Sequence, residues 1–262
     1  MCTDLDIPYT LYGGTAIGAV RHEGFIPWDD DVDVCMLRSD YERFLQEAPA
    51  LLKSEYVIEN SRVNADFPNM FSILGLRNTV FVSEFIKHSP YRMPLAIDIF
   101  PFDAVPADPK EYRRQIKEAW FWGRLMYLQG TPKPYLGFDS ALSRVIHAAT
   151  AVVYYAMKVL RVTPRALQER WERAARRSEN ARTGMFTDFT DRTPEAWQVS
   201  SEELYPSVDA PFEGMTFPLP HEADVILTRG YGAYMELPPV ERRKNHQPYF
   251  VDLGPYAEVD PV

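Results

Sequence analysis

Short runs of alternating apolar and polar residues fill the first hundred positions and predict strands. They are rich in β-branched and aromatic residues and are bounded by turn-forming residues. The expected strands cover 8–12, 32–37, 56–60, 70–76, 79–82 and 95–106. Helices are expected between them, one ending near Gly24 and one over 40–53, opened by an S-x-x-E capping box at Ser39–Glu42. This part of the chain therefore predicts an α+β (α/β-like) fold.

The pattern changes to a helical period after Pro109. Helices are expected at 109–128, 139–160 and 163–180, and the segment after them, rich in Pro, Gly and aromatic residues, predicts loops with one short helix at 221–232. We find no internal repeat or low-complexity linker. We therefore expect one domain over 1–262, made of a sheet core (1–106), a helical lobe (107–182) and a loop-rich C-terminal part (183–262).

The composition is that of a soluble globular protein, with 262 residues of which 46% are hydrophobic and 25% charged. The net charge of −9 argues against a nucleic-acid-binding protein, because such proteins neutralise phosphates with Lys and Arg. Cys2 and Cys35 cannot form a disulfide framework or a four-thiolate zinc site, and the N-terminus lacks the apolar stretch of a signal peptide. We therefore expect a cytoplasmic protein.

The longest apolar run, Ala148–Met157, is too short to span a bilayer. The pattern favours a buried helix. Because Arg144, His147, Lys158 and Arg161 flank the run, a helix lying on the inner face of the membrane is the alternative.

Four carboxylates, Asp29, Asp30, Asp31 and Asp33, crowd together at the start of an apparent core strand. Side chains alternate along a strand, so Asp31 and Asp33 should share one face, as should Asp29 if the strand extends back to it. The mutual repulsion of these acids becomes a binding force when a hard cation is present, and Mg²⁺ prefers oxygen ligands. The cluster therefore predicts a Mg²⁺ (or Mn²⁺) site.

A glycine pair and an isolated acid add to this prediction. Gly13, Gly14 and Thr15 follow a strand and open a helix, so their backbone N–H groups can seat a phosphate. Asp98 stands alone in the apolar strand AIDIF, and we assign it as the base that deprotonates an acceptor hydroxyl and as a metal contact. Each signal also has an ordinary explanation: a simple turn, a solvated acidic loop, an acid that caps or pairs. Together they favour a metal-dependent phosphoryl or nucleotidyl transferase over a structural acidic loop.

The stretch YTLYGGTAIGAVRHEGFIPWDDDVDVCMLRSDYERF (9–44) resembles the signature of the LicD family, phosphocholine transferases related to fukutin. IDIFPFDAVP (97–106) and YGAYMELPPVERRKNH (231–246) resemble the second and C-terminal blocks of that family, whereas the helical middle matches only in general texture. The resemblance implies a nucleotidyltransferase-like mixed sheet. It also implies transfer of a phospho-alcohol unit, usually phosphocholine and in relatives ribitol phosphate, from a CDP-activated donor to a sugar hydroxyl.

By this resemblance, Asp31 and Asp33 are metal ligands, Asp29 an auxiliary acid and Asp98 the third carboxylate, while the residues at 13–15 hold donor phosphates. The acceptor would be a glycan or glycolipid, such as a precursor of lipopolysaccharide or teichoic acid. The chain departs from the family in having only MCTDLDI before the first strand, where a helix is usual, and in lacking a Cys-rich zinc module.

Basic and aromatic residues near these motifs are further candidates for donor binding. Arg21 could reach a donor phosphate, and Lys244 or His246 could neutralise charge on the leaving CMP. Trp28 and the pair Phe121–Trp122 could box a choline ammonium. A surface ion pair, a solvated loop and core packing are the respective alternatives.

The sequence thus predicts a catalytic site in which Asp31, Asp33 and Asp98 face a glycine-lined phosphate seat. Two other functions stay open at this point. One is a nucleotidyltransferase that adenylylates a small hydroxylated acceptor from an NTP, and the other is a metal- or glycan-binding protein without activity.

Overall fold

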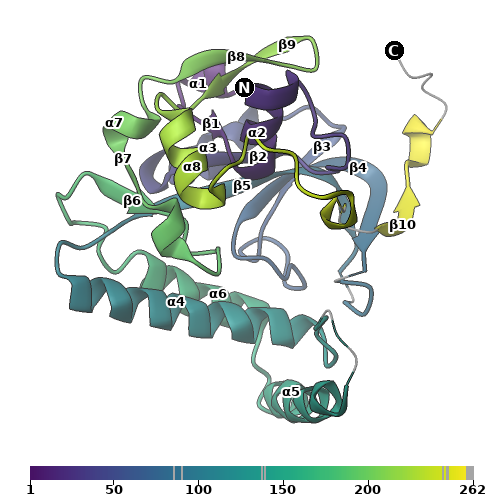
Figure 1. Cartoon of the computed structure of the whole chain (residues 1–262). Coiled ribbons are helices and arrows are strands. Elements are labelled where there is room, and N and C mark those ends of the chain that lie inside the picture. Colours follow the sequence, from purple (N-terminus) through teal and green to yellow (C-terminus); the bar gives the residue numbers. More distant parts are fainter. Residues whose placement is uncertain are drawn as a thin grey trace.

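The computed structural model describes residues 1–84, 86–89, 91–136, 138, 140–243, 245 and 248–257. Its centre is a mixed sheet with the strand order β1-β2-β5-β4-β10, on which β3 pairs with β4, β6 with β5 and β7 with β6 (Figure 1). These strands are β1 (Thr10–Leu11), β2 (Asp33–Leu37), β3 (Tyr56–Glu59), β4 (Ser72–Ser83), β5 (Met93–Ala104), β6 (Met185–Thr187), β7 (Val199–Ser200) and β10 (Pro248–Asp252). The expected mixed α+β fold is confirmed.

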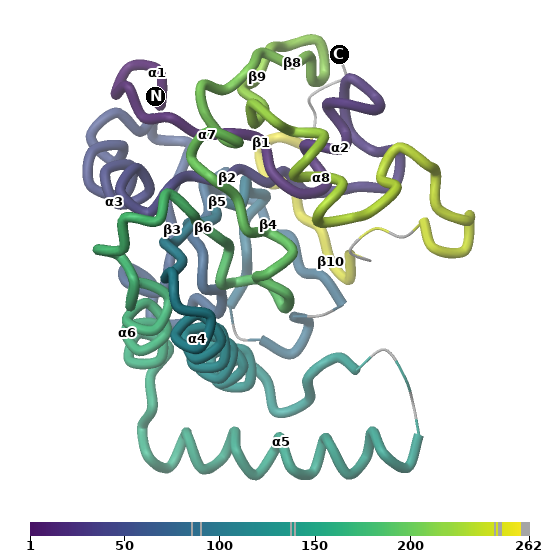
Figure 2. The backbone as a smooth tube through the Cα atoms, turned by 60° about the vertical axis from the view of Figure 1, so that its left-hand side comes forward, coloured from purple at the N-terminus to yellow at the C-terminus, as the bar shows by residue number. Residues whose placement is uncertain are grey.

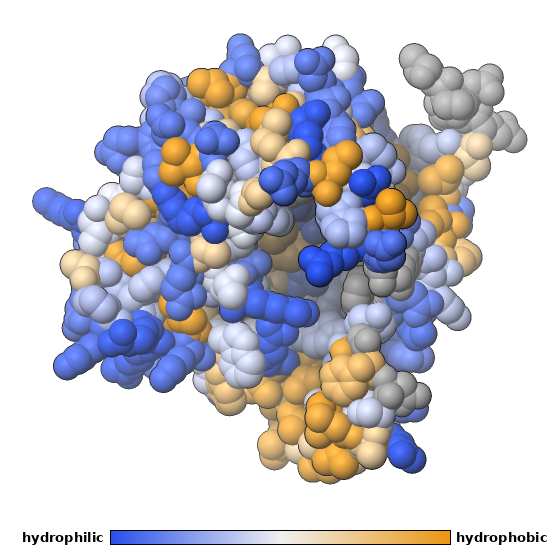
Figure 3. Space-filling model, in the orientation of Figure 1, coloured by the Kyte–Doolittle hydropathy of each residue, from blue (hydrophilic) through white to orange (hydrophobic). Residues whose placement is uncertain are grey.

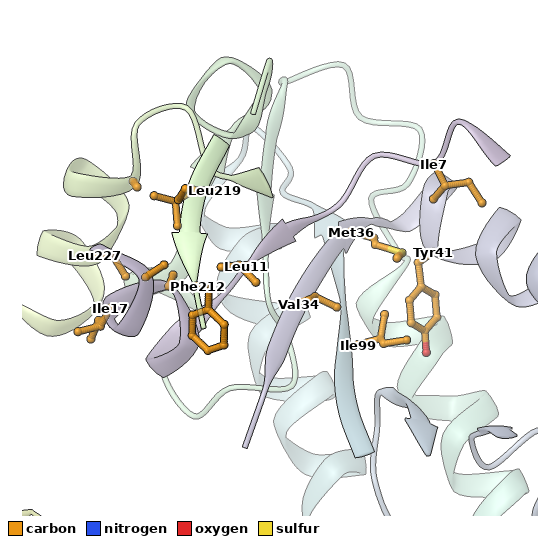
Figure 4. Packing of buried hydrophobic residues seen from close by; sticks show 14 of the residues in the cluster. Ile7, Leu11, Ile17, Val34, Met36, Tyr41, Ile99, Phe212, Leu219 and Leu227 are labelled. Atoms are coloured by element: carbon orange, nitrogen blue, oxygen red, sulfur yellow. The ribbon is translucent and has the colours of Figure 1, made fainter. Parts of the chain in front are cut away.

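One face of the sheet is covered by helices, one of which begins with the glycine pair, and by a small separate hairpin. These elements are α1 (Cys2–Leu5), α2 (Gly13–His22), α3 (Arg38–Glu47), α8 (Ala223–Tyr231) and the strands β8 (Val208–Phe212) and β9 (Met215–Leu219). Figure 4 shows Ile17, Val34, Ile99, Phe212 and Leu227 meeting in this core. Alternate residues of β2, Val34 and Met36, point into it, which leaves Asp33 on the opposite face.

The helical lobe follows β5 and lies below the sheet in Figure 1. It consists of α4 (Pro109–Gly130), α5 (Ala141–Val159) and α6 (Pro164–Ala175), close to the expected ranges. Helices α4 and α6 pack around Trp171, which is fully buried together with Met126 and Leu167. Both helices begin with a proline at the first turn and with an Asp108 or Thr163 side chain that caps a backbone N–H.

Four predictions about helices and strands are wrong. The helix α3 begins at Arg38 without a side-chain cap, because Glu42 contacts the guanidinium groups of Arg38, Arg62 and Arg176 instead of closing a capping box. The strands expected at 70–76 and 79–82 form the single strand β4, whose pairing with β5 shifts in register near Asn78, at a φ of 62°.

The third wrong prediction is that 183–262 is mostly loop. This segment contributes α8, as expected, but also β6, β7, β8, β9, β10 and the short helix α7 (Ser201–Leu204). Prolines inside these strands hid them from the sequence pattern, because β8, β9 and β10 each contain one. Short 3₁₀ helices complete the described elements at Ala48–Ala50, Pro194–Trp197, Val240–Arg242 and Gly254–Tyr256.

Helix α5 is not the buried helix that its apolar sequence favoured. Ser143 and Met157 are its buried residues, and Val145, Val152 and Val159 are 65, 69 and 81% exposed. Within the described ranges, no helix alone has the length and hydropathy to cross a bilayer; α5 and α6 pass such a test only jointly, with 107° between them.

Candidate active site

The glycine pair lies in the first turn of α2 and is tied to the start of β2. The Tyr12 backbone N–H donates to the Asp33 carbonyl at 2.9 Å, and the Asp33 N–H donates to the Thr15 hydroxyl at 2.9 Å. Gly13 has a φ of +56°, and a Cβ at this position would lie 3.0 Å from Asp33 Oδ2. The turn therefore needs glycine both for its backbone conformation and to let the Asp33 carboxylate come close.

Asp33 and Asp98 are brought together as the sequence predicted. They are directly paired residues of the parallel strands β2 and β5, and the Asp98 N–H donates to the Val32 carbonyl at 2.8 Å. Paired residues of neighbouring strands lie about 4.8 Å apart and point to the same face. Phe100, two residues after Asp98, lines the same side of the sheet as Asp33, so both carboxylates lie at one end of this face.

Asp29 and Asp31 also lie near Asp33, but a loop and not an extended β2 positions them. Strand β2 begins only at Asp33, so the alternation argument does not apply to the loop residues before it. Asp29 nevertheless approaches the second glycine, because a Cβ on Gly14 would lie 2.6 Å from Asp29 Oδ2. Each glycine of the pair thus makes room for one carboxylate.

The crowding of acids is visible in the electrostatics of Asp33. Burial raises its pKa well above the ordinary value, and the charges of Asp31, Asp98, Asp29 and Asp188 raise it further. A positive charge bound at this point would relieve all of these repulsions together.

A cavity of about 240 Å³ opens in front of Asp33 and contains acids that the sequence analysis missed. Its wall is formed by Tyr12, Gly13, Asp33, Met70, Phe71, Phe100, Asp188, Thr190, Asp191, Trp197 and Tyr231. Asp188 follows β6 directly, in the run MFTDF, but the strands of this segment are only two or three residues long and give no periodic signal that would have marked the acid as Asp98 was marked.

Asp188 is held in a defined position. It accepts hydrogen bonds from the Tyr12 hydroxyl at 3.1 Å and from the Thr190 backbone N–H at 2.7 Å. Burial raises the pKa of its carboxyl to about 7, although these hydrogen bonds act in the opposite direction. A carboxyl with such a pKa can take up and release a proton near neutral pH.

Other predicted residues have different surroundings. The Arg21 guanidinium donates to the backbone carbonyls of Tyr234 and Glu236, so it fastens the C-terminal segment to α2. Arg243 stacks over Trp28 with its guanidinium carbon 5.0 Å from the ring centroid, and the Phe121–Trp122 pair lies on α4 in the helical lobe. Neither aromatic site lines the cavity. Lys244 and His246 lie outside the described residues.

The carboxylates offer a partial coordination shell for a divalent cation. Among the residues that the structure describes, no three His, Cys, Asp or Glu side chains are grouped as a metal site by themselves. Mg²⁺ normally keeps several waters and takes only one or two carboxylates together with substrate phosphates. The paired Asp33 and Asp98, with Asp29 and Asp31 nearby, fit this kind of incomplete shell.

Comparison with known proteins gives a consistent result. The family model of the LicD/FKTN/FKRP nucleotidyltransferase domain matches residues 6–124, which include the glycine pair, the acidic cluster and Asp98. The lipopolysaccharide cholinephosphotransferase LicD of Haemophilus influenzae is 29% identical over 260 residues, covering 94% of this chain and 89% of that protein. An uncharacterized protein of Rickettsia typhi is 36% identical over 63 residues, which is 24% of this chain and 20% of its own length.

Proposed function

Because the chain belongs to the LicD family, we propose that it transfers phosphocholine from a CDP-activated donor to a sugar hydroxyl of a cell-surface glycan precursor. The H. influenzae relative is a lipopolysaccharide cholinephosphotransferase, and the similarity extends over 94% of this chain. That relationship supports a glycan acceptor, and we propose a lipopolysaccharide or teichoic acid precursor, glycan or glycolipid, as this acceptor. The reaction would take place in the cytoplasm, at the inner face of the membrane.

One observation carries the proposal: Asp33 touches the glycine turn and is paired with Asp98 on the same face of the sheet. The N-terminus of α2 offers backbone N–H groups and the positive end of the helix dipole to the donor phosphates. Carboxylates alone would repel those phosphates. A bound Mg²⁺ or Mn²⁺, held by Asp33 and Asp98 with Asp29 and Asp31 in support, would neutralise the phosphate charge.

The transfer itself needs an acceptor hydroxyl to lose its proton. In the scheme we propose, Asp98 takes this proton, the hydroxyl oxygen attacks the phosphorus that bears the choline, and CMP leaves with the electrons of the broken P–O bond. Asp188 is a second candidate base, since it lines the cavity and its pKa is about 7. Phe71, Phe100 and Trp197 give the cavity an apolar wall, which would disfavour water near the bound donor.

The choice of donor tests the proposal. We expect the protein with Mg²⁺ and a glycan acceptor to release CMP from CDP-choline, and not to release pyrophosphate from CTP or ATP. CMP release from CDP-ribitol and not from CDP-choline would mean that the transferred unit is ribitol phosphate. Pyrophosphate release with labelling of the acceptor by the nucleotide would replace the proposal with a nucleotidyltransferase.

A further inference from the structure

Helix α5 leaves most of its surface uncovered. Its inner side is held by the Thr150 hydroxyl, which donates to the Pro132 carbonyl at 3.3 Å, and by His147 Nε2, which lies 3.0 Å from the Pro134 carbonyl oxygen. Figure 2 shows α5 as the outermost element at the lower end of the molecule, on the far side of α4 and α6 from the sheet. Its opposite side faces away from the protein.

This outer side is apolar along its whole length. Val145, Ala149, Val152, Ala156 and Val159 follow one another at intervals of three and four residues, and so form one line along the helix. All five are exposed. Leu142, Tyr155 and Leu160 widen the line and are 60, 61 and 74% exposed. Figure 3 shows these apolar side chains gathered at the lower end of the molecule. We call this surface the outer face of α5.

The charges around the outer face are positive, although the chain as a whole carries a net charge of −9. Arg144, Lys158 and Arg161 are the charged residues of 140–161, and no Asp or Glu occurs there. Lys and Arg on such a helix can keep their charge in water while their stems cover apolar surface. This combination of an apolar face with basic margins is typical of helices that lie in a lipid–water interface.

The neighbouring groove between α4 and α6 is basic as well. It has a volume of about 510 Å³, and its charged lining consists of Lys117, Arg170, Arg173 and Arg177 with the single acid Glu118, which pairs with Arg177. Figures 1 and 2 both place α4, α6 and α5 on the same side of the sheet. The lobe therefore carries a second basic surface besides the residues that flank the outer face.

We infer that the outer face of α5 docks the protein on an anionic lipid bilayer. Its apolar line enters the boundary between headgroups and acyl chains, and Arg144 and Arg161 contact the lipid phosphates, whereas the Lys158 ammonium lies over the Tyr154 ring. A second copy of the chain is a less suitable occupant, because two such faces would bring the same basic residues against each other. The inference does not depend on the reaction proposed above, since it rests on the helical lobe and not on the acidic site.

Vesicle binding of the full chain tests this inference without any turnover. We expect the protein to sediment with vesicles of phosphatidylcholine mixed with phosphatidylglycerol, and much less with phosphatidylcholine alone. Val152→Asp should weaken binding at least about ten-fold, since a carboxylate at the centre of the face resists insertion. The matched control is Val63→Asp, because Val63 is 70% exposed on the loop between β3 and β4, outside α5, against 69% for Val152.

Charge reversal separates the electrostatic contribution. Arg144→Glu should weaken binding at least about five-fold, whereas Lys53→Glu, outside the lobe, should leave it unchanged. Sedimentation velocity without lipid completes the test. Equal binding of Val152→Asp and Val63→Asp, equal binding to both lipid compositions, or no binding at all would overturn the inference. A dimer that Val152→Asp dissociates would assign the face to a second copy instead.

Discussion

At the scale of single residues, the site depends on how closely carboxylates approach the glycine turn. Gly13 combines a left-handed backbone with a 3.0 Å approach of Asp33 Oδ2 to its missing Cβ. Gly214 has a similar backbone, at φ +71°, but no atom within 4 Å of that position. Comparing alanine variants at these two positions therefore separates the effect of backbone strain from the effect of crowding the Asp33 carboxylate.

Gly13→Ala and Gly214→Ala should both lose about 1–2 kcal/mol of stability, because both force a side chain into the left-handed region. Only Gly13→Ala should also lose transferase activity, by at least about ten-fold, since its methyl group displaces the Asp33 carboxylate. Thermal unfolding and the rate of CMP release measure the two effects. Equal activity of the two variants would show that the approach to Asp33 does not matter for the reaction.

Asp188 makes a prediction about pH. Its pKa is about 7 in the folded protein, against about 3.9 in an unfolded chain. The folded state thus binds this proton more tightly, so the stability that the protonated form provides is present below about pH 4 and is lost as the pH rises to about 7.

Replacing Asp188 by Asn removes this titration. Between roughly pH 5 and pH 8, the wild-type melting temperature should fall more than that of Asp188→Asn. Over the full titration, the free energy of unfolding of the wild type should fall by at most on the order of 4 kcal/mol more than that of the variant. Asp209→Asn, at an exposed position of β8, serves as the control and should follow the wild type. Parallel curves for all three proteins would mean that Asp188 is ionised throughout.

Several of these residues could be predicted from the sequence, for physical reasons that differ. Gly13 and Asp98 were recognisable because a glycine pair before a helix and an acid in an apolar strand both destabilise the fold, which indicates a functional role. Asp188 belongs to the same class, but it lies in a segment whose strands are only two or three residues long. Strands this short give no periodic signal from which an isolated acid would stand out.

At the scale of elements, local signals were outweighed by contacts between distant segments. The S-x-x-E sequence failed as a cap because Arg38 precedes it and is buried against β5, where it donates to both carboxylate oxygens of Asp103 at 2.8 and 2.7 Å. Glu42 in turn forms an ion pair with Arg62, whose Nη1 lies 2.7 Å from Glu42 Oε2. The parallel pairing of β2 with β5, in contrast, joins two strands whose apolar pattern was recognisable; the chain connects them through α3, β3 and β4, and their pairing fixes the position of the two acids.

Helix α5 shows the limit of the hydrophobic pattern itself. Apolar residues on all sides predict a helix that is buried, but the pattern does not specify what covers it. Within the part of the chain that the structure describes, the rest of the protein covers α5 on the side of Ser143 and Met157. The flanking basic residues were the signal that favoured a lipid surface, and that reading agrees with the exposure of the helix.

At the scale of the whole molecule, the sheet separates α2 and α3 from the basic lobe formed by α4, α5 and α6 (Figure 1). Asp33 points away from the core under α2 and α3, so the acidic site at the start of β2 lies on the face of the lobe, and Met70 of its cavity also packs against the core of the lobe. The C-terminal segment returns to the core through α8, and Tyr231 at the end of α8 lines the cavity beside Asp33. Such long-range returns of the chain are not visible in local sequence patterns.

The central claim is that Asp33 helps to bind a divalent cation at the glycine turn. Titration of the protein with Mn²⁺, followed by electron paramagnetic resonance, tests this claim most directly. The wild type and Asp209→Asn should each bind one ion per chain that Mg²⁺ displaces, and Asp33→Asn should bind it at least about ten-fold more weakly while keeping a wild-type circular dichroism spectrum. Unchanged Mn²⁺ binding by a folded Asp33→Asn protein would contradict the account.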